Sequence, residues 1–238
     1  MIKNTPHIPY PVRINRYLAL AGVSTRRGAE DLIRAGKVRI NGRMAVLTDR
    51  VNEGDDVAVS GLEKRNYRYF AFHKPRGVLT NPEKGHAAKA ISDIAGIPGV
   101  FPVGRLDRMS EGLIILTDDG RVTERLLSPK YDHEKEYVVT IRERIRPDMI
   151  HDLEKGPVLE DGPTKPCTVR KISDTTLSIT LTEGRKHQVR RMLSAVSGTV
   201  TSLRRVRIMD IPLGALSVGR HRKLVGDELT RFLSGIGL

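Results

Sequence analysis

Asp107 lies between two arginines, Arg105 and Arg108, in a short loop bounded by glycines at both ends. The loop, residues 104–112, leads directly into the apolar run Leu113–Leu116. Nearby cations favour the ionised form of a carboxylate. At the entrance to a buried strand, such a carboxylate can act as a nucleophile or an electrostatic stabiliser at a sugar carbon. The alternative is an Asp–Arg pair that only fixes a turn, and the loop by itself favours this alternative.

A second candidate segment, residues 183–196, combines a histidine with several cations. Its apolar positions follow helical spacing and predict a helix over Lys186–Val196, with Val189, Met192, Leu193 and Val196 on one face. Another face carries His187, Arg190, Arg191 and Ser194. Such a row suits phosphates or a paired carboxylate. An exposed basic helix face is the alternative, and helical spacing does not exclude it.

Tyr137 is the third candidate, because it lies in a segment with the alternating pattern of a strand. The alternation in residues 133–139 places its side chain on the same face as Val139 and Ile141. Such a position usually belongs to a tyrosine of the hydrophobic core. The functional alternative is an aromatic ring that stacks on a base extruded from a nucleic acid.

The charge of the chain points to a polyanionic partner. Its 238 residues include 41 Lys and Arg against 28 Asp and Glu, which gives a formal net charge of +13. A basic surface attracts nucleic acids, anionic membranes or acidic proteins. The apolar stretch at residues 112–117 is far too short to span a membrane, and the first residues lack the apolar run of a signal peptide. Nucleic acid is therefore the favoured partner, and no membrane is expected.

The single cysteine limits the compartment and the chemistry. Because Cys167 has no second cysteine, no intramolecular disulfide can form, which favours a cytoplasmic protein. We expect Cys167 to be a small buried hydrophobic residue. The sequence offers no cluster of metal-ligating residues, and no metal site is predicted.

Residues 12–61 have the pattern of a small domain with two helices and a hairpin. Apolar residues recur at helical spacing from Val12 to Ala21 and predict a first helix that ends at Gly22, and Ser24 or Thr25 can cap a second one. Asn41-Gly42 follows a short strand and predicts a hairpin that leads into a small sheet.

Basic residues concentrate on the helices and the first strand of this domain. They are Arg13, Arg16, Arg26, Arg27, Arg34, Lys37 and Arg39. A solvated face explains them about as well as an RNA-binding surface does, but the order of elements favours RNA binding. Residues 13–18, 22–27 and 33–42 resemble the S-four RNA-binding domain. The resemblance implies a docking domain for structured RNA with no chemistry of its own.

The rest of the chain, residues 67–238, predicts a larger domain. Strand patterns outnumber helical ones without strict alternation, which favours an α+β fold around a mixed, largely antiparallel sheet. Strands are expected near residues 68–72, 112–116, 136–142, 168–172, 177–182 and 201–207. Helices are expected near 122–127, 147–154, 186–196 and 227–233. Residues 1–11 are expected to be a flexible leader and residues 62–66 a linker.

Together these segments resemble pseudouridine synthases of the RsuA/RluB/RluE/RluF branch. The loop at residues 104–120 follows the Gly-Arg-Leu-Asp signature of that branch, and residues 73–77, 134–137 and 183–192 support it. The resemblance spans about residues 12–233. It implies an enzyme that detaches uracil from its ribose, turns the base and rejoins it through carbon 5, with no metal or organic cofactor. The resemblance also favours a catalytic role for Asp107 over an Asp–Arg pair that only fixes a turn.

The resemblance implies roles for individual residues. The catalytic aspartate falls on Asp107, its basic partner on Arg190, and the base-stacking tyrosine, which also helps to move the carbon-5 proton, on Tyr137. A hydrophobic pocket residue falls on Leu203, and the other substrate-binding candidates are Arg105, Arg108, Lys186, His187 and Arg191. A displacement route, in which Asp107 attacks the anomeric carbon, and a glycal-forming route, in which it accepts a proton, use the same residues.

The expected substrate is ribosomal RNA, or a ribosomal precursor particle, bound by a monomer. Residues 101–103, 133–137 and 164–167 look closest to the RluF type, which modifies large-subunit (23S) rRNA, whereas His187 matches the small-subunit enzyme. Transfer RNA is an additional candidate substrate. A non-catalytic RNA-binding or ribosome-assembly factor on the same scaffold is the alternative function, and charge alone would also fit a DNA-binding protein.

Overall fold

The computed structural model describes residues 8–61, 66–82, 88–128 and 131–238. The chain forms two compact units, an N-terminal unit (Met1–Arg68 with Thr117–Arg125) and a C-terminal unit (Tyr69–Leu116 with Leu126–Leu238). Each unit has its own hydrophobic core. The expected leader and linker fall largely outside the described residues, although Ile8 is described and is buried in the N-terminal core.

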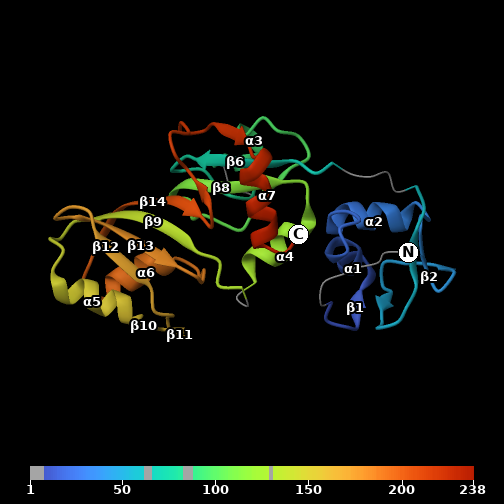
Figure 1. Ribbon diagram of the computed structural model, residues 1–238, viewed down its shortest axis with the longest axis horizontal. Helices are drawn as coiled ribbons and strands as arrows, with labels where there is room; N and C mark the ends of the chain where they lie inside the picture. Colours follow the sequence, from blue (N-terminus) through green and yellow to red (C-terminus); the bar gives the residue numbers. More distant parts are fainter. Residues whose placement is uncertain (1–7, 62–65, 83–87, 129–130) are drawn as a thin grey trace. The chain divides into compact units, whose positions relative to one another are not determined.

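The N-terminal unit contains two complete helices, most of α4 (Gly120–Leu127) and short antiparallel strand pairs (Figure 1). The helices are α1 (Ile14–Leu20) and α2 (Arg26–Arg34), and Thr25 caps α2 by accepting a hydrogen bond from the Gly28 amide at 3.0 Å. A three-stranded sheet has the order β3 (Arg43–Met44), β2 (Val38–Ile40), β5 (Val57–Val59).

The first helix begins later than its sequence pattern predicts. Val12 and Arg13 form β1, which pairs with β4 (Arg50–Val51), so Val12 lies opposite Val51 and both side chains are buried. The pairing of Val12 therefore overrides the helical spacing at this position. It also places Arg13 on a strand, where its side chain is exposed.

A nine-stranded sheet forms the centre of the C-terminal unit. Its main path has the order β12-β13-β9-β14-β8-β6-β16, with β7 beside β8 and β15 beside β14. The strands are β6 (Tyr69–Lys74), β7 (Phe101–Val103), β8 (Glu111–Thr117), β9 (Lys135–Ile141), β12 (Thr168–Lys171), β13 (Thr176–Leu181), β14 (Val200–Ile208), β15 (Ile211–Pro212) and β16 (His221–Lys223). β14 runs antiparallel to β9 and parallel to β8, which confirms the expected mixed, largely antiparallel sheet.

Helices α5 (Pro147–Lys155) and α6 (Gln188–Ala195) lie beside the part of the sheet formed by β12, β13 and β9 (Figure 1). Their buried residues, among them Leu153 and Met192, share one core with Leu177, Ile179 and Val139. The other helices are α3 (Ile91–Ile94), α4 (Gly120–Leu127) and α7 (Gly226–Gly235), and β10 (Val158–Leu159) and β11 (Gly162–Pro163) form a separate hairpin.

The longer elements lie close to their predicted positions, which confirms the α+β fold. α6 begins at Gln188 rather than Lys186, because His187 has a left-handed backbone with φ of 53° and precedes the first helical turn. Periodicity did not indicate α3, β7, β10, β11, β15 or β16, since elements of two to four residues are too short to show a period.

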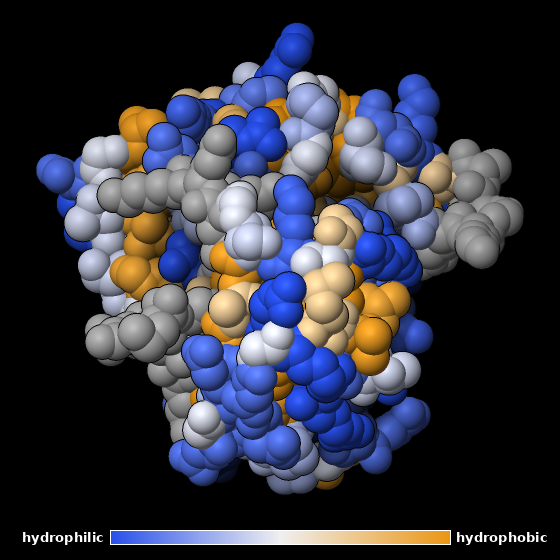
Figure 2. Space-filling model, turned by 90° about the vertical axis from the view of Figure 1, so that its right-hand side faces the viewer, coloured by the Kyte–Doolittle hydropathy of each residue, from blue (hydrophilic) through white to orange (hydrophobic). Residues whose placement is uncertain are grey.

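Hydrophilic side chains predominate on the face that Figure 2 shows, with hydrophobic ones in smaller areas between them. This agrees with a composition of 29% charged residues. In the part of the chain that the structure describes, no helix combines the length and the apolarity that crossing a bilayer requires.

Candidate active site

A buried lysine at the end of β6 shapes the loop that carries Asp107. Lys74 is fully buried, and its Nζ donates hydrogen bonds to the main-chain oxygens of Pro75 at 3.0 Å, Asp107 at 3.2 Å and Ser110 at 2.8 Å. Burial of a charged group is costly unless it is hydrogen-bonded, and here the loop carbonyls supply those bonds. The ammonium group therefore gathers both sides of the loop around one point.

The segment after β6 holds the same loop at two further positions. The Thr80 hydroxyl donates to the main-chain oxygen of Leu106 at 2.6 Å and accepts from the Leu106 amide at 3.0 Å. The Gly77 amide donates to the main-chain oxygen of Arg108 at 2.7 Å. The main chain on both sides of Asp107 is thus held by the Thr80 hydroxyl and the Gly77 amide, which lie about thirty positions earlier in the chain.

Gly112 allows the loop to enter the sheet. Its φ is 116°, and a Cβ atom at this position would lie 2.3 Å from the main-chain oxygen of Arg205. Only glycine fits such a close backbone approach at positive φ. The approach lets β8 run beside β14, with Gly112 opposite Arg205, and Arg205 lies opposite Tyr137 on the other side of β14.

These elements enclose a pocket of about 610 Å³ within the C-terminal unit. Six of the predicted site residues line it: Arg105, Asp107, Tyr137, Lys186, His187 and Leu203. Tyr137 and Leu203 are almost completely buried and form part of its apolar wall, together with Leu126 and Val189. The pocket therefore combines an acidic group with an aromatic and aliphatic surface, as a site for a nucleoside requires.

The basic side chain in contact with the Asp107 carboxylate is that of His187 rather than one of the flanking arginines. His187 Nε2 lies 3.4 Å from Asp107 Oδ1, and the Asp107 side chain is 30% exposed. The left-handed backbone of His187 turns this residue out of the helix that follows it. Arg190, on the first turn of α6, donates to the main-chain oxygen of Met109 at 3.2 Å and also interacts electrostatically with Asp107.

Burial lowers the pKa of the cationic groups around this pocket. The pKa of Lys74 falls from 10.5 to about 8, chiefly because the side chain is desolvated, although Asp107 acts in the opposite direction. The pKa of Lys135, which lines the pocket, also falls to about 8, again chiefly through burial and then through the charge of Arg205. Burial lowers the pKa of Arg190, and the negative charge of Asp107 partly opposes this lowering. With a pKa of about 8, Lys74 and Lys135 still carry most of their positive charge at neutral pH.

Family models match both units of the chain. The model for RNA pseudouridylate synthase matches residues 68–195, which include the whole Asp107 loop, β9 and α6. The chain belongs to this family. A model for the S4 domain matches residues 12–57, the two helices and small sheet of the N-terminal unit.

Relatives of this synthase match nearly all of its length. RluF of Escherichia coli K12, a dual-specificity RNA pseudouridine synthase, is 36% identical over 223 residues, 92% of this chain and 77% of the relative. An uncharacterised RNA pseudouridine synthase of Aquifex aeolicus is 40% identical over 238 residues, 95% and 96% of the two chains. Ribosomal large subunit pseudouridine synthase B of Bacillus subtilis is 35% identical over 230 residues, which are 92% of this chain and 94% of the relative.

A solved pseudouridylate synthase has the same fold. Its structure superposes with a TM-score of 0.69 at 29% sequence identity and covers 93% of this chain and 99% of its own. The family is catalytic, so these findings favour an enzyme over the non-catalytic alternative.

Three predicted substrate-binding or catalytic arginines of the synthase make contacts within the protein. Arg108 donates to the main-chain oxygen of Gly77 at 3.3 Å, and Arg191 forms two hydrogen bonds with Asp161 at 2.8 and 3.1 Å. Arg190 contacts the loop at Met109. Arg105 and Lys186 are exposed at the pocket, where phosphates can reach them.

In the N-terminal unit, most of the predicted RNA-binding side chains are exposed. Arg16 pairs with Glu124 at 3.6 Å, Arg34 with Glu30 and Asp31, and Arg39 donates to the main-chain oxygen of Gly42. Within the described ranges of the chain, Arg13, Arg26, Arg27 and Lys37 form no ion pair.

Sequence reasoning missed Lys74 and Lys135 as members of the synthase site. Lys74 ends a strand, Tyr69–Lys74, in which every residue is buried. A charged residue in such a strand is a signal of function, because Lys is almost never fully buried without a partner. The residues described here contain no group of three or more His, Cys, Asp or Glu side chains that could hold a metal ion.

Proposed function

We propose that this synthase isomerises a uridine of ribosomal RNA to pseudouridine, with Asp107 as the catalytic carboxylate. The observation that carries the proposal is the pocket that brings Asp107, Tyr137, His187 and Leu203 together from four separate segments. A uridine must leave its base stack to reach this pocket, which costs a few kcal/mol. The aromatic face of Tyr137 can replace part of the lost stacking.

In the displacement route, a carboxylate oxygen of Asp107 bonds to C1′ of the ribose as the C1′–N1 bond breaks and its electron pair leaves with uracil. The base then turns, C5 bonds to C1′ as the carboxylate leaves, and the proton on C5 passes to N1. Tyr137 supports the base during this turn and helps to move that proton. A glycal-forming route, in which Asp107 accepts a proton instead of forming a bond, uses the same groups.

Cations of the pocket support this chemistry electrostatically. His187 Nε2 lies 3.4 Å from the Asp107 carboxylate, and the guanidinium group of Arg190 attracts this carboxylate electrostatically. Arg105 and Lys186 are exposed at the rim, where they can contact phosphates next to the target nucleotide. These contacts offset the cost of extruding the uridine.

The N-terminal unit supplies affinity for the RNA in this proposal. We assign docking to residues 12–61, joined by a linker at residues 62–66 to a catalytic domain at residues 67–238. The exposed basic side chains of α1, α2 and β2 supply the charge for phosphate contacts. Deleting residues 1–61 should therefore weaken RNA binding, and an unchanged rate at low RNA concentration would contradict docking.

The proposed substrate is large-subunit rRNA, free or in a precursor particle, with tRNA as a second candidate. The names of two relatives support this proposal, one a ribosomal large subunit pseudouridine synthase and the other a dual-specificity RNA pseudouridine synthase. We further propose that the enzyme works in the cytoplasm as a monomer. The absence of a metal or organic cofactor is part of the same proposal.

The decisive experiment maps pseudouridines in rRNA after incubation with the purified protein. We expect carbodiimide labelling to show one new modified position with the natural chain and none with Asp107→Ala. The Asp107→Ala protein should still bind the RNA, since the carboxylate contributes no phosphate contact. Activity retained in Asp107→Ala would contradict the assignment of the carboxylate, whereas no modification by the natural chain would contradict the enzyme itself.

A further inference from the structure

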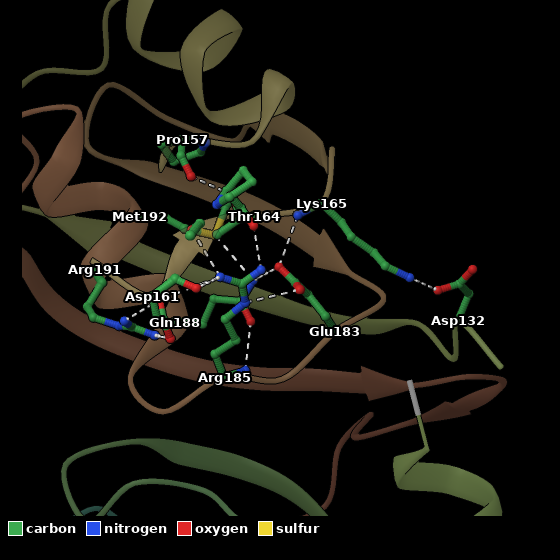
Figure 3. Close-up of polar contacts among 12 residues, drawn as sticks. Asp132, Pro157, Asp161, Thr164, Lys165, Glu183, Arg185, Gln188, Arg191 and Met192 are labelled. Atoms are coloured by element: carbon green, nitrogen blue, oxygen red, sulfur yellow. Dashed lines mark hydrogen bonds and ion pairs between the residues drawn. The ribbon is translucent and has the colours of Figure 1, made fainter. Parts of the chain in front are cut away.

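The turn of the hairpin β10–β11 binds the start of α6 through a network of charges (Figure 3). Asp161, in this turn, accepts hydrogen bonds from Arg191 Nη1 at 2.8 Å and Nη2 at 3.1 Å. Arg185 Nη1 lies 3.5 Å from the same carboxylate and donates to the main-chain oxygen of Gly162 at 3.0 Å, and its Nη2 donates to that of Pro163. One acidic residue thus holds two arginines on either side of the beginning of α6.

A second layer of bonds fixes the segment between these arginines. Gln188 is buried, and its side chain accepts from the Arg185 amide at 2.8 Å and donates to Glu183. Glu183 also accepts from Arg185 Nε at 3.3 Å and from the Lys165 amide at 3.1 Å (Figure 3). The segment 183–188 is therefore tied to the hairpin and to the start of α6 at once.

This segment carries the groups that face Asp107. His187 lies between Arg185 and Gln188 and has a left-handed backbone, a conformation that costs energy for a residue with a side chain and persists only when its surroundings enforce it. Its Nε2 lies 3.4 Å from Asp107 Oδ1. Arg190 directly precedes Arg191 in the chain. Any shift of residues 185–191 would move the side chains of both His187 and Arg190 relative to the carboxylate.

We propose that Asp161 is a positioning residue, which holds His187 and Arg190 in place beside Asp107 through its ion pairs with Arg191 and Arg185. The inference rests on the proposed function, because it assigns Asp161 to the same reaction. It also assigns Arg185 and Arg191 to the support of the site rather than to phosphate contacts. The hairpin β10–β11 then acts as a brace for the active site.

A single exposed ion pair usually contributes little, because solvent screens it. The contact of Asp161 differs in two respects. It is a two-point contact between a carboxylate and a guanidinium, which has geometric specificity, and it is continuous with the buried bonds of Gln188. The pKa of Asp161 is lowered, chiefly by the hydrogen bond from Arg191, so the carboxylate is ionised at neutral pH.

The test compares steady-state kinetics of Asp161→Asn, Asp161→Glu and a matched control, Asp174→Asn. Asp174 also pairs with two cations, Arg144 at 3.1 Å and Lys171 at 3.0 Å, and it lies at the opposite end of β12 and β13 from the pocket. We expect kcat of Asp161→Asn to fall roughly tenfold to a hundredfold, because small displacements of catalytic groups have effects of this size. KM for RNA should not rise, because removing a negative charge does not weaken attraction to phosphate.

The conservative variant and the control give the proposal its sharpest test. Asp161→Glu keeps the charge and should recover most of the lost kcat, and Asp174→Asn should change kcat less than about twofold. The proposal is overturned by equal kcat values for Asp161→Asn and Asp174→Asn. A rise in KM at unchanged kcat would also overturn it and would assign Asp161 to substrate binding.

Amide hydrogen exchange provides a readout that does not need the reaction. We expect faster exchange at residues 185–191 in Asp161→Asn, with unchanged exchange in β6, β8 and β14. Faster exchange throughout the C-terminal unit would overturn positioning in favour of general destabilisation. If the natural chain modified no RNA, the proposed function would fail, but the exchange data would still show whether Asp161 braces the segment.

Discussion

The two units of this synthase use charge in different ways. In the N-terminal unit the basic residues lie close together in the sequence and mostly on the surface, and four of them form no ion pair within the described residues. In the C-terminal unit the charges of the site come from β6, β9, the Asp107 loop, α6 and β14, and nearly all have partners within the protein.

The difference separates affinity from chemistry. Binding through many exposed charges is a sum in which each residue contributes a small share. Catalysis through a few positioned groups depends on geometry, so one residue can determine the outcome. Single substitutions should therefore have small effects in the N-terminal unit and large effects around Asp107, and the following predictions test this contrast in order of decreasing effect.

The largest effect is expected for Asp107→Asn, which keeps the shape of the side chain and removes its charge. We expect kcat to fall by at least about 10⁴-fold, the range seen when a reacting group is removed. RNA affinity measured by filter binding should change less than about twofold. A residual rate within about tenfold of the natural enzyme would show that the carboxylate does not react.

Gly112→Ala should destabilise the C-terminal unit by about 3 kcal/mol, because the new Cβ would meet the Arg205 main-chain oxygen at a positive φ. Gly54→Ala in the N-terminal unit is the matched control. Gly54 also has a positive φ, 90°, but nothing lies within 4 Å of its added Cβ. We therefore expect Gly54→Ala to lower the free energy of unfolding by only about 1 kcal/mol. Urea unfolding of each variant measures the difference, and equal losses would show that the close approach is unimportant.

Because of Lys74, we expect the stability of the protein to rise and its activity to fall as the pH increases above about 8. Its pKa is lowered from 10.5 to about 8 by burial, so the unfolded chain binds more protons between about pH 8 and 10.5. The contribution of Lys74 to the free energy of unfolding therefore rises with pH across this window. Activity should fall above about pH 8, because the charge beside Asp107 is lost. In Lys74→Met, whose basal activity is expected to be low, the rise in stability over this window should be smaller.

The smallest effects are expected in the N-terminal unit. Arg27→Ala should weaken RNA binding less than about threefold. When Arg26, Arg27 and Lys37 are all replaced with Gln, the loss of binding free energy should equal the sum of the three single losses. Each phosphate contact that is removed should also lower the slope of log K against log salt concentration by about 0.7 to 0.9. A large loss from Arg27→Ala alone would indicate a specific contact and would break the contrast between the units.

Elements long enough to show a period were predictable from the sequence, and so was the signature loop. Strands such as 112–116 and helices such as 147–154 lie where alternation and helical spacing placed them. The hairpin β10–β11 was not predictable, because each strand has two residues. α6 also begins two residues later than its pattern predicts, because His187 has a left-handed backbone that helical spacing does not reveal.

The amino-acid sequence by itself determined the family, the signature loop that contains Asp107 and the basic character of the N-terminal unit. These properties depend on residue types and local spacing, which a linear chain records directly. The tertiary structure decided which basic groups lie near Asp107, because Lys74 lies on β6, whereas His187 and Arg190 lie at the start of α6, more than a hundred positions later in the chain. It also turned Arg191 toward Asp161, since a guanidinium pairs with the carboxylate that folding places beside it.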